Sequence, residues 1–595
     1  MIYLFKKAWK YSGEDRWKVI VFYILHTISY SGELLQPFAF GKAINSLQIN
    51  GVEYLSSTLR WFGLYLVGFF VFQIFHHTAR FFEMTTAYRN QQRFINDMYS
   101  KVYNLPMRWH TDHHSGEVVN RINTAGLAIR NFGFAQYEYL GNFLLSLGPV
   151  IVLTIISWKI SAICLTLTTV NLVVVQKMNK IIHPILERQN EHSHAYAARL
   201  IDFVGNIKTI ISLRLKKETS KELDKKFDGY YKEHMNEFWI NQPRCFIIGL
   251  GGIVTEFAII LYYLWACRIS GEAILVGTFI LIINYYKQMR DAFFQITSNF
   301  YETLRWKADI ESVNPILQSS CEYESDKIQE GISLWNQVSI RNLNFKYDKE
   351  KDTLQNIDMD ITNDSKIAIV GLSGCGKSTL INILAGFYEP EEVKLFIEYK
   401  EYSQLNILSN SAMLAPQDVE IFENTLEYNI TFGLDADKGE LEKVIDIARL
   451  NEVIERLPKG IKTDIREKGV NLSGGEKQRL ALARALFFSK GKNMLLLDEV
   501  TSNVDAFNER LIFKELFKAY NKSCVICTIH RLHLLDMFDT VVVMDNGRIL
   551  QKGSFSKLIK TEGYFKKLWE MYLIKDMELE EDLTYNQDFD IENIS

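Results

Sequence analysis

The sequence has few cysteines and no surplus of positive charge. Seven cysteines are scattered over 595 residues, and the one close pair, Cys524 and Cys527, lies in the run SCVICTIH. Residues three apart on a strand face opposite sides, so this pair predicts a buried core strand rather than a redox or metal site. The formal net charge is -4, and no clustered basic surface stands out. Nucleic acid is therefore not an expected partner, because its binding depends on such a surface.

Apolar residues are concentrated in the first half of the chain. A helix needs about 20 mostly apolar residues to cross the hydrocarbon core of a bilayer. Six runs reach that length: 17–40, 60–79, 136–157, 160–178, 244–266 and 273–296, of which polar residues interrupt the last one most. The first run is too long for a cleaved signal, and no A-x-A site follows it. The sequence predicts six transmembrane helices in a lipid bilayer.

Lysine and arginine in the connections predict the orientation of these helices. Basic residues precede the first run and follow the second: Lys6, Lys7, Lys10, Arg16, Lys18, Arg80, Arg89, Arg93, Lys101 and Arg108. The alternate connections hold few, so both termini are expected in the cytoplasm, with the chain in a cell (inner or plasma) membrane. The two long cytoplasmic connections, 80–135 and 179–243, have few glycine or proline breakers, which predicts helices that continue beyond the bilayer.

Two carboxylates fall within or near the predicted membrane helices. Glu256 lies near the middle of the fifth run, in GGIVTEFAII, where an ionised side chain costs about 3 kcal/mol. It is a candidate for the substrate path, with a neutral or hydrogen-bonded packing carboxyl as an equal alternative. Glu33 is a weaker candidate, because it falls near the outer end of its run.

The second half changes to short apolar strands alternating with helical segments, an α/β pattern. We place the transmembrane domain at 1–314, a polar linker at 315–332, an α/β domain at 333–574 and an acidic tail at 575–595. The acidic tail after residue 575, DMELEEDLTYNQDFDIENIS, predicts a disordered, solvated end rather than a docking motif. The fold class is thus a helical membrane domain with six transmembrane helices fused to an α/β domain, whose loop GLSGCGKST predicts a P-loop nucleotide-binding domain.

A glycine-rich turn between a strand and a helix predicts a phosphate site. KIAIV leads into GLSGCGKST, whose amides and helix N-terminus suit phosphate oxygens. Lys377 would neutralise the phosphates and Ser378 would reach Mg2+. The loop residues proposed to contact ATP are Gly371, Ser373, Gly374, Cys375, Gly376, Lys377, Ser378 and Thr379. Because Cys375 stands next to Lys377 at a helix N-terminus, its thiol is expected to be a reactive thiolate.

The strand NMLLLDE supplies the carboxylates that hydrolysis needs. Asp498 is placed to enter the Mg2+ shell, and Glu499 to orient the attacking water. Between the P-loop and this strand lies NLSGGEKQR, at 471–479. With that signature the sequence resembles the ABC transporters over nearly its whole length.

The resemblance implies a second ATP contact and several further site residues. In that family the signature of one nucleotide domain caps the ATP of its partner, which would assign Ser473, Gly474, Gly475 and Glu476 to the partner's nucleotide. Tyr347 in NFKY would stack on adenine, Gln417 in APQD would sense Mg2+, and His530 in TIHR would touch the γ-phosphate. Glu476 replaces the more usual glutamine, and SNVD at 502–505 replaces the commoner SALD. These departures bear on fine control, not on catalysis.

Two further features resemble the exporter branch. TDIREKG at 463–469 is similar to the loop that touches the membrane helices, and HHSGEVVNRI at 113–122 resembles the segment of a coupling helix. A second coupling helix is expected near 205–216. No peptidase-like extension precedes the first run, so cleavage of a peptide leader is not expected.

The sequence therefore predicts an ABC half-exporter, a translocase driven by ATP with Mg2+. Its partner would be a second half-transporter, more readily an identical chain than a different one. The substrate is expected to be amphipathic or hydrophobic: a small molecule, a lipid or a peptide. The alternative is an ATP-gated channel or membrane regulator that uses the same ATPase. Six membrane crossings exclude a soluble ABC protein acting on ribosomes or DNA.

Overall fold

The computed structural model describes residues 1–51, 55–113, 115–319, 334–347, 353–402, 404–465 and 472–573. The chain divides into two compact units, and each is described by itself. One unit comprises Met1–Tyr103 and Ser115–Ser319, and the other comprises Asn104–His114 and Ser320–Ser595. The tail proposed at 575–595 and most of the linker proposed at 315–332 lie outside the described residues.

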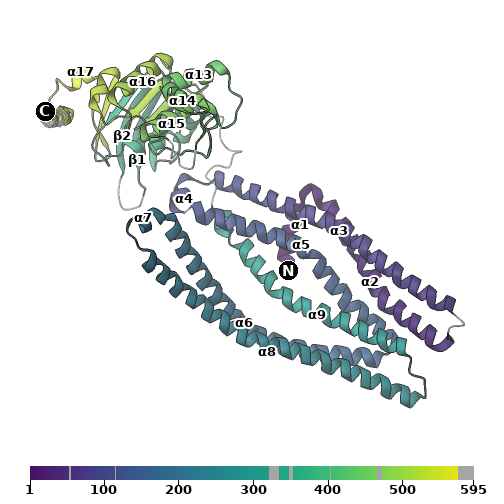
Figure 1. Cartoon of the computed structure of the whole chain (residues 1–595). Coiled ribbons are helices and arrows are strands. Elements are labelled where there is room, and N and C mark those ends of the chain that lie inside the picture. The colour runs from purple at the N-terminus through teal and green to yellow at the C-terminus, as the bar shows by residue number, and fades with distance from the viewer. Residues whose placement is uncertain are drawn as a thin grey trace, which may run out of the picture. The chain divides into compact units, whose positions relative to one another are not determined.

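Long helices that run side by side form the first unit (Figure 1). Among its described residues, six helices have 35 residues or more: α2 (Arg16–Asn50), α3 (Leu55–Tyr103), α5 (Ser115–Ile156), α6 (Trp158–Gly205), α8 (Lys216–Ser270) and α9 (Val276–Glu311). Each predicted apolar run falls on a different one of them. Shorter helices are α1 (Ile2–Ser12), α7 (Ile207–Ser212) and α10 (Asn314–Gln318).

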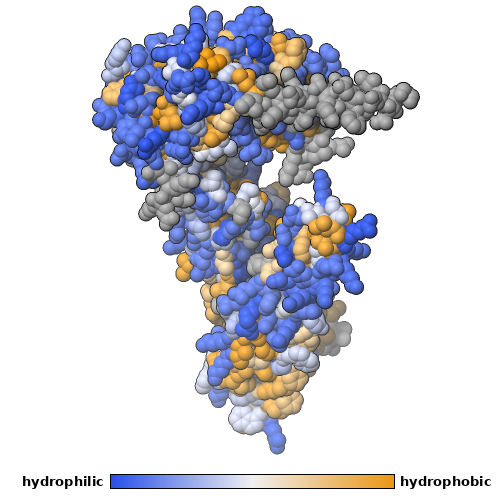
Figure 2. All heavy atoms as spheres, turned by 90° about the vertical axis from the view of Figure 1, so that its left-hand side faces the viewer, coloured by the Kyte–Doolittle hydropathy of each residue, from blue (hydrophilic) through white to orange (hydrophobic). Residues whose placement is uncertain are grey.

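Four of the long helices, α3, α5, α6 and α8, are apolar enough along a membrane-length window to cross a bilayer. On α3, large apolar side chains such as Leu66, Phe70 and Ile74 are more than half exposed. Figure 2 shows such hydrophobic side chains gathered on the lower surface of the helical unit. An exposed apolar surface of this kind fits lipid rather than water. For α2 and α9 a crossing stays a prediction, because each carries more polar residues.

The second unit is built around a six-stranded sheet in the order β12-β11-β3-β10-β9-β6. The bounds are β3 Lys366–Val370, β6 Ala412–Ala415, β9 Met494–Asp498, β10 Cys524–Thr528, β11 Thr540–Asp545 and β12 Arg548–Gly553. All neighbours pair in parallel except β11 with β12. Residues of β3, β9 and β10 are buried at every position, as in a parallel sheet covered on both faces.

An antiparallel sheet accompanies it, in the order β2-β1-β4-β5. Its strands are β1 (Gln337–Phe345), β2 (Leu354–Thr362), β4 (Glu392–Ile397) and β5 (Lys400–Tyr402). The helices that bear on the site are α11 (Lys377–Leu384), α15 (Gly474–Phe488) and α16 (Ala506–Ala519).

The cysteine pair of β10 lies in the core, as the sequence predicts. Cys524 belongs to the apolar cluster on one side of the sheet and Cys527 to the cluster on the other. Both are at most 1% exposed, and burial raises the pKa of the Cys524 thiol to about 12.

The short helices between the long ones differ in part from expectation. The first is α4 (Met107–Asp112), which ends before the predicted segment 113–122. Residues 115–122 form the beginning of the long helix α5 instead, with Glu117 in its first turn. Pro106 precedes α4 in an extended conformation, and its ring fixes the φ angle there. The prediction of the coupling helix did not take this proline into account. The second, α7, lies inside the predicted range 205–216.

Candidate ATP site

The predicted ATP-site residues gather at one edge of the parallel sheet. The P-loop follows β3, Gln417 comes two residues after β6, Glu499 follows β9, and His530 comes two residues after β10. Parallel strands end at the same edge, so their C-terminal loops meet there.

The P-loop holds a buried ammonium group. Lys377 is 5% exposed, and its Nζ donates to the carbonyl oxygens of Gly371 at 3.0 Å and Leu372 at 3.1 Å. Gly374 and Gly376 have φ values of 80° and 106°, a region that favours glycine. Because both partners of the ammonium are neutral, its charge is left for an anion such as phosphate to neutralise.

Two oxygen atoms that suit Mg2+ lie together beside the loop. Ser378 Oγ donates to Asp498 Oδ1 at 3.1 Å, and Thr528 Oγ1 donates to the same oxygen at 2.7 Å. Burial raises the pKa of Asp498, against the opposing effect of these hydrogen bonds. A hydroxyl and a carboxylate are ligands that Mg2+ accepts alongside phosphate oxygens and water, so these residues fit the ion. Thr528 was not predicted, although it is the first residue of the TIHR motif.

Glu499 is held at the end of β9 by partners from two other strand ends. Gln417 Nε2 donates to Glu499 Oε2 at 2.9 Å, and His530 Nε2 lies 2.5 Å from Oε1. The Glu499 backbone N–H donates to Thr528 Oγ1 at 2.9 Å, and its φ is 51°. Two separately predicted residues, Gln417 and His530, thus converge on the predicted carboxylate of Glu499, a group that can accept a proton from water.

The Tyr347 ring is supported on its edges by two other aromatic rings. Phe345 and Tyr388 meet it in edge-to-face geometry, at centroid distances of 4.9 and 5.2 Å. Its hydroxyl donates to Thr379 Oγ1 at 3.4 Å, and the residue is 37% exposed. An aromatic ring fixed in this way is suited to stacking on a base. Sequence reasoning missed Tyr388, which belongs to no recognised motif.

The signature segment forms the start of α15 and is closed by a capping box. Glu476 Oε2 accepts from the Ser473 backbone N–H at 2.8 Å, and Ser473 Oγ accepts from the Glu476 N–H at 3.3 Å. Arg456 also pairs with Glu476, at 2.7 Å. Although burial opposes it, the Ser473 hydrogen bond and the Arg456 guanidinium hold the pKa of Glu476 below its ordinary value. The glutamate thus has a structural role in fixing the N-terminus of α15.

The signature helix is also tied to the segment that follows Glu499. Gln478 Oε1 accepts from the Asn503 N–H at 2.8 Å, and its Nε2 donates to Ser502 Oγ at 2.7 Å and to Glu499 O at 3.3 Å. A Cβ at Gly475 would lie 2.6 Å from Asn503 O, so the close approach requires glycine there. Gln478 was also missed, although it belongs to the signature run. It connects the signature with the backbone of Glu499.

The expectation of a reactive Cys375 is wrong. The side chain is 5% exposed and packs in the apolar cluster with Leu354 and Met544. Burial raises the pKa of the Cys375 thiol, and this effect outweighs the opposing influence of Lys377. The sequence places Cys375 near Lys377 but does not show that the thiol is buried in the apolar core.

The exporter-type loop at 463–469 is described only in part. Asp464 and Ile465 form the two-residue strand β8, which pairs with β7 (Asn424–Thr425). Residues 466–469 lie outside the described residues.

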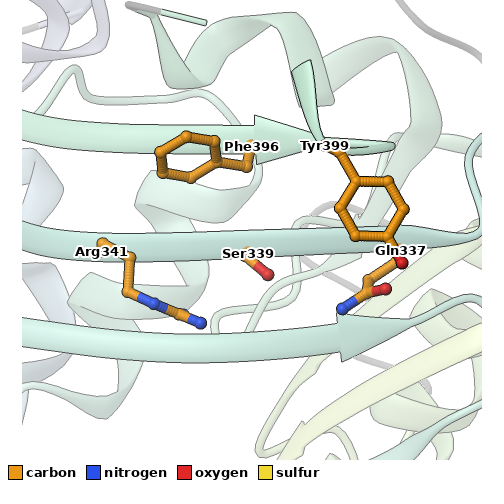
Figure 3. A pocket seen from close by; sticks show the side chains of 5 residues that line it. All are labelled: Gln337, Ser339, Arg341, Phe396 and Tyr399. Carbon is orange, nitrogen blue, oxygen red and sulfur yellow. The ribbon is translucent and has the colours of Figure 1, made fainter. Parts of the chain in front are cut away.

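A separate pocket of about 280 Å³ lies on the antiparallel sheet (Figure 3). Gln337, Ser339 and Arg341 alternate along β1, and Phe396 and Tyr399 complete the lining. None of these residues was predicted for the ATP site. Arg341 pairs with Asp360 at 2.5 Å, so its charge is already compensated.

In the helical unit, Glu256 on α8 has two cationic neighbours on α9. Its carboxylate oxygens lie 3.8 Å from Lys287 Nζ and 3.8 Å from Arg290 NH1, and its side chain is 25% exposed. Sequence reasoning considered the carboxylate alone and missed both cations.

Comparison with known proteins places both units in one kind of protein. The family model described as ABC transporter matches residues 354–502, and the model described as ABC transporter transmembrane region matches residues 19–293. The uncharacterized ABC transporter ATP-binding protein YfiC of Bacillus subtilis is 25% identical over 588 residues, 95% of this chain and 93% of that protein. An ATM1-type heavy metal exporter of Novosphingobium aromaticivorans is 25% identical over 562 residues, 92% and 91% of the two chains.

A solved structure has the same fold over nearly its whole length. It is a bacterial Atm1-family ABC exporter with ATP bound, which superposes with a TM-score of 0.81 at 22% identity. The superposition covers 93% of this chain and 99% of that one.

Proposed function

This chain belongs to the ABC transporter family, as an exporter-type half-transporter that couples ATP hydrolysis to transport, and on that premise we propose that two copies work as a dimer in the cell membrane. Each copy would contribute six crossings and a cytoplasmic ATP-binding unit. The dimer would move an amphipathic or hydrophobic substrate outward. The apolar surfaces of α3, α5, α6 and α8 support the membrane placement.

The convergence of Gln417 and His530 on Glu499 carries the proposed hydrolytic mechanism. Lys377 would bind the β- and γ-phosphates, and Ser378, Gln417 and Asp498 would hold Mg2+. When bound, Mg2+ would neutralise the charge that develops on the phosphates. Glu499 orients water and accepts its proton, while His530 contacts the γ-phosphate and keeps the carboxylate in place.

We assign Ser473, Gly474, Gly475 and Glu476 to the ATP of the partner subunit. The capping box fixes the N-terminus of α15 and occupies the N–H groups of Ser473 and Glu476, while those of Gly474 and Gly475 have no acceptor one turn earlier in the helix and suit phosphate. Lys377→Ala on one chain and Ser473→Arg on a differently tagged chain test this assignment. Either variant alone damages both sites of its homodimer, whereas the mixed dimer gathers both lesions in one site. ATP occlusion should return to the other site.

Occlusion in the mixed dimer no better than in either parent would exclude the partner assignment. Purification through both tags controls for dimer formation. Absence of any dimer of identical chains would replace the homodimer with a heterodimer.

Glu256, with Lys287 and Arg290, is the proposed polar point on the substrate path. Glu256 on α8 and the two cations on α9 remain partly exposed. Each of them can therefore leave its partner and bind the polar group of an amphipathic substrate instead. One relative is named a heavy metal exporter, so metal complexes of small organic ligands belong in the substrate panel beside lipids, drugs and peptides.

ATP-dependent uptake into inside-out vesicles tests the function as a whole. An exporter should accumulate substrate above the outside concentration only with hydrolysable ATP, and Glu499→Gln should abolish the accumulation. Equilibration without accumulation, gated by ATP, would instead identify a channel.

A further inference from the structure

The segment SNVD, at 502–505, connects the turn that holds Glu499 with helix α16. At its start, the Ser502 backbone N–H donates to the Glu499 carbonyl oxygen at 3.2 Å. At its end, Asp505 caps α16 by accepting from the Asn508 backbone N–H at 2.9 Å. The residues between these points form neither strand nor helix, so contacts with other parts of the chain must hold the segment in place.

One arginine binds two carbonyl groups of this segment. Arg531 NH1 donates to the Val504 carbonyl oxygen at 2.5 Å, and its NH2 donates to the Ser502 carbonyl oxygen at 3.2 Å. Arg531 directly follows His530, whose Nε2 lies 2.5 Å from Glu499 Oε1. The guanidinium therefore joins the backbone that carries His530 to the segment that follows Glu499.

Glu509, in the first turn of α16, holds this guanidinium in place. The residue is 3% exposed. Its Oε2 accepts from Arg531 NH1 at 3.0 Å, and its Oε1 accepts from Thr501 Oγ1 at 2.7 Å. Nε2 of His533 lies 3.9 Å from Oε2, which is too far for a hydrogen bond. Because a buried carboxylate is costly without its partners, Glu509 fixes both the arginine and the threonine.

We propose that Glu509 and Arg531 are positioning residues of the ATP site, which set the place of His530 relative to Glu499. Their ion pair fixes both chain segments from which these two site residues extend: one through Thr501 and the SNVD carbonyl groups, the other through the backbone next to His530. Glu509 and Arg531 act through Glu499 and His530 and make no contact of their own with the nucleotide.

The ion pair should therefore affect hydrolysis far more than ATP binding. Lys377 and Tyr347, which are proposed to bind phosphate and adenine, lie on other segments, after β3 and after β1. A displacement of about 1 Å in a site can reduce a rate by about 100-fold. The inference deepens the proposed function and rests on the roles proposed there for Glu499 and His530.

Glu509→Gln in the full-length protein tests the proposal. The single amide oxygen can accept from Arg531 or from Thr501, and the amide NH2 then faces the other donor. Hydrolysis is measured in a single turnover as the rate per bound ATP, so that unfolded protein does not contribute. We expect this rate to fall by about tenfold or more, with the Kd for ATP, measured without Mg2+, unchanged within about twofold.

Thr501→Val is the second variant, because it removes one hydroxyl donor and leaves the buried charges paired. It should slow hydrolysis in the same way, and the conservative change Thr501→Ser should keep the parental rate. Asp536→Asn is the matched control. Asp536 pairs at 2.8 Å with Arg510, the neighbour of Glu509 on α16, and so joins the same helix to the region after β10. This exposed pair does not include the SNVD segment, so the control should keep the parental rate.

A parental rate per bound ATP in both Glu509→Gln and Thr501→Val would overturn the proposal, even if the melting temperature fell, because the ion pair would then serve stability alone. An equal loss in Asp536→Asn would also overturn it, since any link between α16 and the region after β10 would then suffice. Glu499→Gln separates this inference from the proposed function. If Glu499→Gln is inactive while the Glu509 and Thr501 variants are normal, only the positioning role fails; if Glu499→Gln hydrolyses ATP at the parental rate, the proposed site itself fails.

Discussion

Replacement of Glu499 by glutamine should separate ATP binding from hydrolysis. The carboxylate accepts from Gln417 Nε2 at 2.9 Å and meets His530 Nε2 at 2.5 Å. An amide of the same size can still accept from Gln417 through its oxygen and donate to a neutral His530 through its nitrogen. The backbone should keep its φ of 51°, because glutamate and glutamine have a similar conformational cost at a positive φ. The substitution therefore removes the proton acceptor and little else.

The size of the effect follows from the role assigned to this residue. A positioned general base contributes roughly 10²–10⁴-fold to a rate, which corresponds to about 3–5 kcal/mol of activation free energy. Phosphate release at saturating MgATP should fall by that factor. Retention of labelled ATP on the full-length protein should be equal to or greater than in the parent. Glu442→Gln, an exposed position, is the control. Turnover within tenfold of the parent would refute the assignment of Glu499 as the base.

Three further outcomes are expected. Cys375 should react with maleimide more slowly than free cysteine at the same pH, because burial raises its pKa; rapid labelling that Cys375→Ala abolishes would contradict this. Glu476→Ala should lower stability by about 2 kcal/mol through the lost cap, and Glu476→Gln by less. Because the pKa of Glu476 is lowered in the folded chain, its contribution is present above the unfolded pKa and is lost as pH falls through the folded value; thermal melts at pH 7 and pH 4 measure this. Glu256→Gln should leave basal ATPase unchanged but alter its stimulation by substrate or the pH dependence of that stimulation; unchanged transport across the panel would assign Glu256 to packing.

The sequence was sufficient to predict the fold class and the order of the motifs. A strand followed by a glycine-rich turn and a helix has few structural solutions, and the structure has β3, the P-loop and α11 in that order. The same holds for the long helices, because apolar runs with few breakers specify length and continuity. These features depend on neighbours in the sequence.

Contacts between distant segments could not be predicted in the same way. Glu256 is on α8, and its two cationic partners lie on α9. Similarly, the fully buried His26 of α2 has its Nε2 3.5 Å from Oε2 of Glu83, which lies on α3. The burial of Cys375 depends on Leu354 and Met544, which come from strands β2 and β11. Gln478 lies in the recognised signature, but the motif does not indicate which backbone groups its side chain will bond. Residue type and spacing carry no information on such packing.

The position of β3 in the sheet has a consequence for synthesis of the chain. Both of its neighbours, β10 and β11, come from the far end of the ATP-binding unit. Val370 and Asp545 are 175 residues apart (545 - 370), so at ribosomal rates the P-loop strand waits about 10–35 s before its second neighbour exists. Until Thr540 is made, the fully buried strand β3 lacks at least one of its two neighbours, and a ribosome stalled at that point would hold a nascent chain that has every proposed phosphate-binding residue of the P-loop but an open edge where β11 belongs.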